Sequence, residues 1–135
     1  QPARGQVLLT APIPGLRLKG TFHADEGYVY FRDFAGGVLL GGGRNLDKTG
    51  EATTEDAVTP QIQEHLEKLL RTTIIPDQPF TIARRWSGVM GFGSEGKAPL
   101  VERVSLHVMA AVRLSGMGVA IGIRVARKAA GFVGE

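Results

Sequence analysis

The stretch that decides the fold lies near the end of the chain: residues 106–114 (LHVMAAVRL), 115–118 (SGMG) and 119–133 (VAIGIRVARKAAGFV). The first part has the apolar pattern of a strand and the last part that of a helix. A strand that enters a helix through a glycine-rich turn favours an anion site, because bare glycines admit a ligand to the backbone and the helix dipole faces it. Close packing of strand and helix explains the same glycines equally well.

The charges around this turn support a ligand site. No acidic residue lies between Glu102 and Glu135. Five cations lie there: Arg103, Arg113, Arg124, Arg127 and Lys128. The glycines at 116, 118 and 122 are spaced one residue more widely than the dinucleotide-binding fingerprint. We therefore expect a closing contact to a cofactor whose main cradle lies elsewhere.

The composition restricts the class of protein. A chain of 135 residues can form one domain with its own core. It has no cysteine, which excludes disulfides, thiolate metal ligands and a cysteine nucleophile. Residues 1–67 contain six basic and nine acidic residues, so their formal net charge is −3. Residues 68–135 contain ten basic and four acidic residues, so their formal net charge is +6. The basic half suits a phosphate or carboxylate, but its dispersed cations and the 7% aromatic content predict no nucleic-acid partner.

No apolar run approaches the roughly 20 residues of a membrane span, and no signal peptide is visible. We expect a soluble, cytoplasmic protein without a membrane span. Because the chain starts at Gln1 rather than at methionine, we also expect an excised end, with part of the protein upstream.

The pattern predicts an α+β fold with an antiparallel-rich, mixed sheet. Strands are expected at residues 6–11, 16–22, 28–31, 38–40, 80–86 and 106–114, with a glycine-rich loop at 88–99. Residues 28–31 and 38–40 are expected to pair as an antiparallel hairpin.

Two helices are predicted. The first, amphipathic, covers about 59–72, with Thr59 as N-cap and Pro60 in the first turn. Its apolar residues recur at helical spacing: Ile62, Leu66, Leu69 and Leu70. The second ends a strand-turn-helix unit at about 106–133. It is apolar over most of its circumference, so we expect it to be largely buried.

Other chemistry-bearing residues have weaker support. No metal ligand and no nucleophile is predicted, because the histidines and serines lack partners at the necessary spacing. Tyr28 and Tyr30 would share one strand face and could line a pocket, although packing explains them better. Trp86 stands among glycines, which suggests either a ring over a pocket or an aromatic residue that fills the core.

Four segments occur in the order seen in FAD-dependent oxidoreductases of the D-amino acid oxidase and glycine oxidase family. They are Pro2–Val7, Tyr28–Tyr30 with Val38–Gly42, Trp86–Gly88 and Leu114–Val119. The chain resembles this family from residue 2 to residue 133. The resemblance implies that residues 1–105 are a portion of the substrate domain, and that residues 106–135 return to the flavin domain. The Rossmann-like FAD domain would lie in an N-terminal part of the full-length protein, outside this chain.

The resemblance also implies site residues. The cofactor contact would be made by Ser115, Gly116, Met117, Gly118 and Val119, where the helix N-terminus meets the flavin ring near N1 and the C2 carbonyl. The substrate pocket would be lined by Tyr28, Tyr30, Trp86 and Met90.

Met90 stands where many of these enzymes have an arginine that pairs with the substrate carboxylate. A thioether cannot make that charge-assisted contact, so another cation would have to replace it. The candidate replacements are Arg32, Arg44 and Arg85.

We therefore expect part of an FAD-dependent oxidoreductase that moves a hydride from an amine, an amino acid or a related small substrate to the flavin. The isolated chain should be inactive, and bare apolar surface should cause it to self-associate. The alternative is a free-standing, non-catalytic α+β module that binds a small anion or a protein partner through its basic half.

Overall fold

The computed structural model describes residues 1–93, 96 and 98–132 of the chain. These residues form two compact units, each considered by itself. The larger unit is Arg4–Val89, and the smaller one combines Gln1–Ala3 with Met90–Glu135. The fold class is α+β, as predicted, and both sheets are antiparallel.

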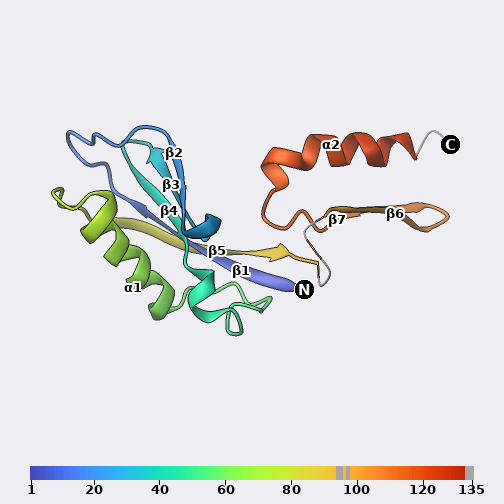
Figure 1. The fold of residues 1–135 in the computed structure, drawn as a ribbon, viewed down its shortest axis with the longest axis horizontal. Helices are drawn as coiled ribbons and strands as arrows, with labels where there is room; N and C mark the ends of the chain where they lie inside the picture. The colour runs from blue at the N-terminus through green and yellow to red at the C-terminus, as the bar shows by residue number, and fades with distance from the viewer. Residues whose placement is uncertain (94–95, 97, 133–135) are drawn as a thin grey trace. The chain divides into compact units, whose positions relative to one another are not determined.

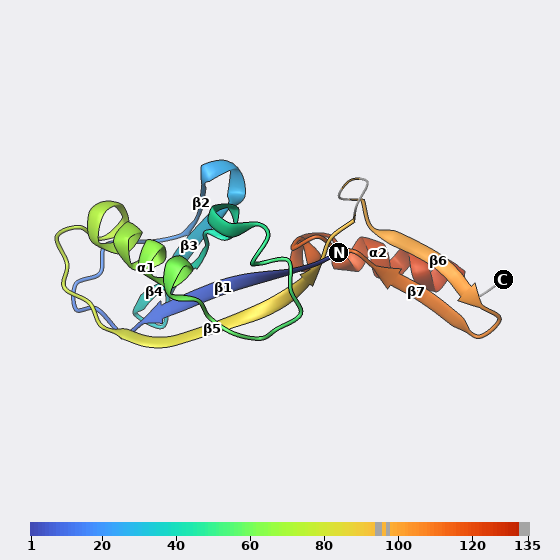
Figure 2. The same cartoon turned by 90° about the horizontal axis from the view of Figure 1, so that it is seen from below.

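The larger unit is built on a five-stranded sheet with the order β2-β3-β4-β1-β5 (Figure 1). Its strands are β1 (Pro2–Thr10), β2 (Thr21–Ala24), β3 (Val29–Phe34), β4 (Gly37–Gly42) and β5 (Ile82–Gly91). β1 and β5 run side by side (Figure 2). They are antiparallel, because Ala11 N–H donates to the Thr81 carbonyl at one end and Phe92 N–H donates to the Gln1 carbonyl at the other.

The hydrophobic core lies between this sheet and α1 (Pro60–Leu69), which continues as a π-helical turn at Leu70–Ile74. The helix contributes fully buried side chains at helical spacing: Ile62, Leu66 and Leu70. The strands contribute buried side chains from one face: Leu8, Val38 and Leu40. The register brings these together, since Leu8 lies opposite Leu40 across β1 and β4. Burying each such side chain stabilises the fold by roughly 2 kcal/mol.

The predicted first helix is confirmed, but its ends differ from the expectation. Thr59 precedes the first helical residue, as an N-cap should, yet its hydroxyl does not cap the helix. The hydroxyl instead accepts a hydrogen bond of 2.9 Å from Gln6 Nε2. At the other end, the π-helical turn carries the helix past residue 72 to Ile74.

The predicted hairpin is confirmed, because β3 and β4 pair antiparallel with Phe31 opposite Leu40. The predicted strand at 16–22 is wrong, since only Thr21–Ala24 is extended and paired. Gly15 and Gly20 have φ of +71° and +106°, which break the extended conformation before Thr21.

The strand expected at 80–86 extends to Gly91, so the glycine-rich loop expected at 88–99 is shorter than predicted. Gly88 lies inside β5 rather than in the loop. Pairing with β1, which is far away in the sequence, holds these glycines in an extended conformation. Local composition cannot show such a pairing.

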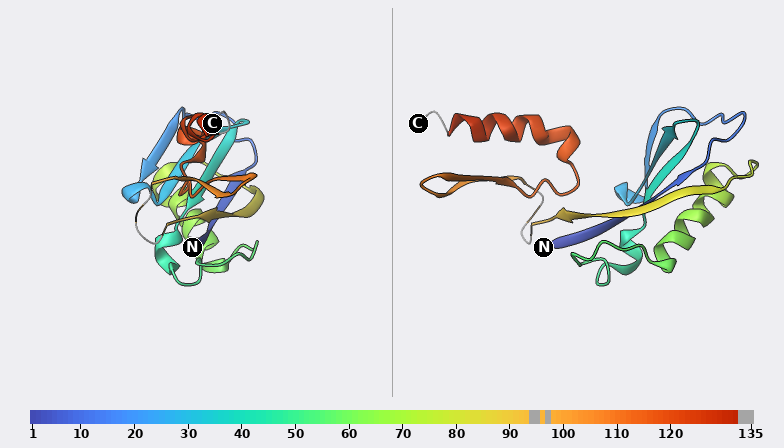
Figure 3. Two further views of the ribbon diagram at one scale, coloured as in Figure 1. Left: turned by 90° about the vertical axis from the view of Figure 1, so that its right-hand side faces the viewer. Right: turned by 180° about the vertical axis from the view of Figure 1, so that it is seen from behind.

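The smaller unit contains a β-hairpin and a helix that lies along it (Figure 3). The elements are β6 (Leu100–Ser105), β7 (Val108–Val112) and α2 (Gly118–Gly131). The predicted strand at 106–114 is therefore too long, because residues 106 and 107 form the hairpin turn. β6 was not predicted at all.

The prediction that the last helix is largely buried is wrong. Within α2 only Val125 is buried, whereas Val119 is fully exposed and Ile123 is 72% exposed. A hairpin of two strands can cover only one stripe of a helix, so the remaining apolar residues of α2 stay bare.

A buried polar network joins β1 to the loop before α1. Arg4 and Glu51 are 4% and 1% exposed, and the guanidinium donates to both carboxylate oxygens, at 3.1 and 2.8 Å. The hydrogen bonds to Glu51 raise the pKa of Arg4 above its ordinary value. Gln6 Nε2 donates to the same carboxylate at 2.9 Å, and Gln6 Oε1 accepts from Thr59 N–H and Gln63 Nε2.

The network continues to the edge strand β5 through the half-buried side chains of Arg85 and Glu67. Arg85 donates to Gln63 Oε1 at 2.6 Å and to Glu67 Oε1 at 2.5 Å. Arg71 donates to the other oxygen of Glu67 at 2.7 Å. The hydrogen bonds from Arg85, and then those from Arg71, lower the pKa of Glu67. Hydrogen bonds thus link side chains of β1, α1 and β5.

Glu51→Gln should lower the free energy of unfolding by about 3–5 kcal/mol, because the buried guanidinium of Arg4 loses its counter-charge. Glu67→Gln is the matched control and should cost at most about 1 kcal/mol, because water screens the partly exposed carboxylate. Urea unfolding of both variants gives the comparison. An equal loss of unfolding free energy in both variants would show that burial does not determine how much each ion pair contributes to stability.

Glu67 should also make stability depend on pH in a defined direction. Because its folded-state pKa lies below the ordinary value of 4.5, its contribution is present above that pH. The contribution is lost as the pH falls through the lower folded-state value. Unfolding experiments between about pH 6 and pH 3 should therefore show wild-type stability falling more steeply than that of Glu67→Gln. Parallel curves would contradict this assignment.

Candidate functional site

The candidate site is a hollow of about 530 Å³ in the smaller unit, at the turn from β7 into α2. It is called the β7–α2 hollow below. The residues that line it are Met90, Gly91, Val112, Arg113, Leu114, Ser115, Gly116, Gly118 and Val119. Four of the five predicted cofactor residues are among them, and the fifth, Met117, is the N-cap residue of α2.

The backbone of the turn is strained. Arg113, Ser115 and Gly116 have φ of +64°, +51° and +79°, although only glycine adopts such values easily. Ser115 N–H donates to the Gly91 carbonyl at 3.2 Å, and Met117 N–H donates to the Leu114 carbonyl at 2.8 Å. The first bond holds the turn against the end of β5, and the second closes the turn itself. Strain of this kind is found at functional sites, where the surrounding structure enforces it.

The first turn of α2 presents backbone donors without partners. The Met117 carbonyl accepts hydrogen bonds from Ala120 and Ile121, and no side chain caps the helix. The N–H groups of Gly118 and Val119 meet no acceptor in the described part of the chain. Together with the helix dipole, these groups favour a ligand that carries negative charge or carbonyl oxygens.

Ser115 adds a further unpartnered group. The residue is 9% exposed, and its Oγ is buried without a hydrogen-bond partner among the described residues. A buried hydroxyl without a partner costs about 1–3 kcal/mol. A ligand that supplies an acceptor in the hollow would remove this cost.

The structure brings Met90 to the same place as the turn. Its Sδ would lie 3.3 Å from a Cβ added at Gly116, so Gly116 gives the backbone the room to approach this side chain. One predicted substrate residue and four of the predicted cofactor residues therefore line one hollow. The sequence gave no indication of the contact between Met90 and Gly116, because it depends on where the end of β5 lies relative to the turn.

The other three predicted substrate residues belong to the larger unit. Tyr30 is half-buried, and its ring lies over Gly41. A Cβ added at Gly41 would come within 2.5 Å of that ring. Burial raises the pKa of the Tyr30 hydroxyl. Tyr28 precedes β3 instead of lying on it, so the expectation that both tyrosines share a strand face is wrong. Trp86 is half-buried on β5, with the Arg84 guanidinium 5.6 Å from its ring centre.

The proposed replacements for the missing arginine are also engaged in the larger unit. Arg85 pairs with Glu67, and Arg32 lies over the Phe34 ring at 5.1 Å. Arg44 lies 5.8 Å from the centre of the Tyr28 ring. The cation that lines the β7–α2 hollow is Arg113, which the sequence indicated only as part of the basic segment.

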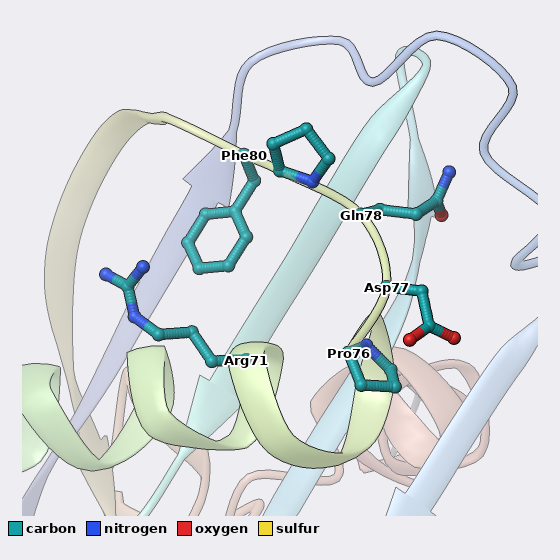
Figure 4. A pocket seen from close by; sticks show the side chains of 6 residues that line it. Arg71, Pro76, Asp77, Gln78 and Phe80 are labelled. Carbon is teal, nitrogen blue, oxygen red and sulfur yellow. The ribbon is translucent and has the colours of Figure 1, made fainter.

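A second hollow, of about 430 Å³, lies in the larger unit between the end of the π-helical turn and β5. Figure 4 shows that its polar side chains do not converge, because Asp77 and Gln78 point away from Arg71 and Phe80. Arg71 also forms an ion pair with Glu67, and its guanidinium lies 4.9 Å from the centre of the Phe80 ring. This hollow therefore lacks the features of a binding site.

The described residues contain no group of three or more histidine, cysteine, aspartate or glutamate side chains that could hold a metal ion. Among the same residues, no helix has both the length and the apolar character needed to cross a bilayer.

Comparisons with known proteins agree with the fold. The model of a family described as "DAO: FAD dependent oxidoreductase" matches residues 1–131. The structure is similar to the crystal structure of L-proline dehydrogenase from P. horikoshii, with a TM-score of 0.74 and 17% sequence identity. The match covers 98% of this chain and 35% of that one, so the chain spans about a third of that structure. No curated protein matches the chain.

Ser115→Gly should stabilise the ligand-free protein by about 1 kcal/mol, because glycine tolerates positive φ and the unpartnered hydroxyl is removed. Gly116→Ala should do the opposite, since it places a Cβ at φ +79°. Thermal unfolding of the two variants tests the strain. A destabilised Ser115→Gly would show that the turn has no strain to relieve.

Proposed function

Because the chain belongs to the family of FAD-dependent oxidoreductases, we propose that the β7–α2 hollow binds the flavin ring of FAD in the complete protein. The observation that carries this proposal is a set of donors that have no partner among the described residues: the N–H groups of Gly118 and Val119 and the hydroxyl of Ser115. The pyrimidine edge of the ring offers carbonyl oxygens and ring nitrogens as acceptors.

The electrostatics of the hollow suit this role. The positive end of the α2 dipole and the side chain of Arg113 both favour negative charge. FAD bound here would supply the electron acceptor for the oxidation of a substrate carbon, and the α2 N-terminus and Arg113 would favour negative charge on its ring. The donors at the N-terminus of α2 are in place before the reaction, so the backbone need not reorganise to stabilise that charge.

The rest of the site is proposed to lie outside this chain. Residues 1–105 would belong to the substrate domain, and residues 106–135 would return to the flavin domain, in line with the family resemblance. The Rossmann-like part that holds the ADP portion of FAD would be supplied by an N-terminal domain of the full-length protein. The bare apolar residues of α2, among them Val119 and Ile123, are a suitable surface for that domain.

The proposed substrate is an amine, an amino acid or a related small molecule. The similar solved structure is named as a dehydrogenase of an amino acid, L-proline, which supports this class. Met90 and Val112 make part of the hollow apolar, so they would exclude water from the reacting carbon.

The complete protein should be purified gently and its absorbance spectrum recorded. We expect the two bands of oxidised flavin, and we expect an amine or amino acid in a substrate panel to bleach them without oxygen, while 2-hydroxy acids do not. Gly116→Ala should reduce the flavin content, because a Cβ at φ +79° displaces the turn. Gly131→Ala, with nothing within 4 Å of its added Cβ, is the control and should keep the flavin.

A colourless wild-type protein that takes up no FAD would overturn the proposal. A flavin that only 2-hydroxy acids reduce would leave the cofactor in place and overturn the substrate class.

A further inference from the structure

The three methionines of the chain all belong to the smaller unit, and they differ in exposure. Met117 is 52% exposed, whereas Met90 and Met109 are half-buried. Met117 is also the N-cap residue of α2, and its side chain makes no capping hydrogen bond. An exposed thioether therefore stands at a position where side chains that carry an oxygen atom usually accept from the backbone.

The N–H groups that follow Met117 distinguish it from an ordinary exposed methionine. The N–H groups of Gly118 and Val119 find no acceptor in the part of the chain that the structure describes. These donors and the positive end of the helix dipole favour negative charge on an oxygen atom that reaches Met117. The sulfur thus lies where the departing oxygen of a peroxide would be stabilised.

We propose that Met117 is a site of oxidation by hydrogen peroxide, and that its sulfoxide blocks the start of α2. In this step a lone pair of the Met117 sulfur attacks one peroxide oxygen, and the S–O bond forms as the O–O bond breaks. The departing hydroxide takes the proton of the transferred oxygen and leaves as water. The sulfur is oxidised by two electrons to the sulfoxide, and the peroxide is reduced.

The sulfoxide places a strong acceptor beside donors that have none among the described residues. Its oxygen is separated from Cα by as many bonds as the amide oxygen of glutamine. An N-cap side chain accepts from the second or third N–H group of the helix, and Val119 is the second residue of α2. The oxidised side chain therefore competes with a flavin carbonyl for the Val119 N–H group. This consequence rests on the proposed function, whereas the oxidation itself does not.

Peptide mapping of the complete protein after treatment with hydrogen peroxide tests the site. Trypsin cuts after arginine and lysine, so it separates the three methionines into peptides 86–97, 104–113 and 114–124. We expect peptide 114–124 to gain the mass of one oxygen atom first, because Met117 is the most exposed of the three. Equal rates, or faster oxidation of Met90 or Met109, would overturn the assignment.

Titration of the complete, FAD-free protein with FAD tests the consequence. Oxidation should raise the dissociation constant roughly fivefold, the change expected when one hydrogen bond is lost. Met117→Gln should raise it to a similar extent without peroxide, because glutamine carries an oxygen at the same separation from Cα. Met117→Leu should bind FAD equally before and after peroxide. Met109→Leu is the matched control and should stay as sensitive to peroxide as the wild type.

Two results of the titration would overturn the proposal. If peroxide weakens FAD binding in Met117→Leu as much as in the wild type, oxidation at another residue is the cause. If Met117 is oxidised and the affinity for FAD does not change, the sulfoxide does not block α2. A wild-type protein that binds no FAD before treatment refutes the proposed function instead, and the peptide map still decides whether Met117 is the oxidised residue.

Discussion

The structure of the larger unit depends on the buried ion pair between Arg4 and Glu51. Removing two charges from water is costly, and the pair is tolerable only because their partners are all present. Glu51 accepts from Arg4 and Gln6, and Gln6 in turn binds Thr59 and Gln63. The first strand, the loop before α1 and the helix itself are thereby held in one arrangement, to which the hydrophobic core adds most of the stabilisation.

The smaller unit differs, because its central feature is a set of polar groups that find no hydrogen-bond partner in the part of the chain that the structure describes. The strained backbone at Ser115, the unpartnered hydroxyl of the same residue and the uncapped start of α2 all cost stability. Natural sequences keep such costs where a function requires them. In a family of FAD-dependent oxidoreductases, the bound flavin ring is the group that would meet these donors.

Much of this could be predicted from local sequence. Helical spacing of Ile62, Leu66 and Leu70 predicted α1. The glycines at 116 and 118 predicted a turn between a strand and a helix, and the family resemblance implied its role as a cofactor contact. β6, the length of β5 and the exposure of α2 were missed or wrong, because each depends on pairing between distant segments. That Arg113 lines the hollow was missed for the same reason, because its Nε donates to the carbonyl of Ala98 in another segment of the chain.

The sequence by itself determined the chemistry available at the carboxyl-terminal turn, the α+β class and, through the order of four short segments, the family. The chemistry of the turn and the fold class are local or additive, so periodicity and composition are enough to predict them, whereas the family was indicated by a resemblance. Only the tertiary structure decided that Glu51 meets Arg4, that Met90 packs against Gly116 and that α2 keeps a bare apolar face. Each of these depends on which distant segments come into contact, and many sequence patterns are compatible with the same contact.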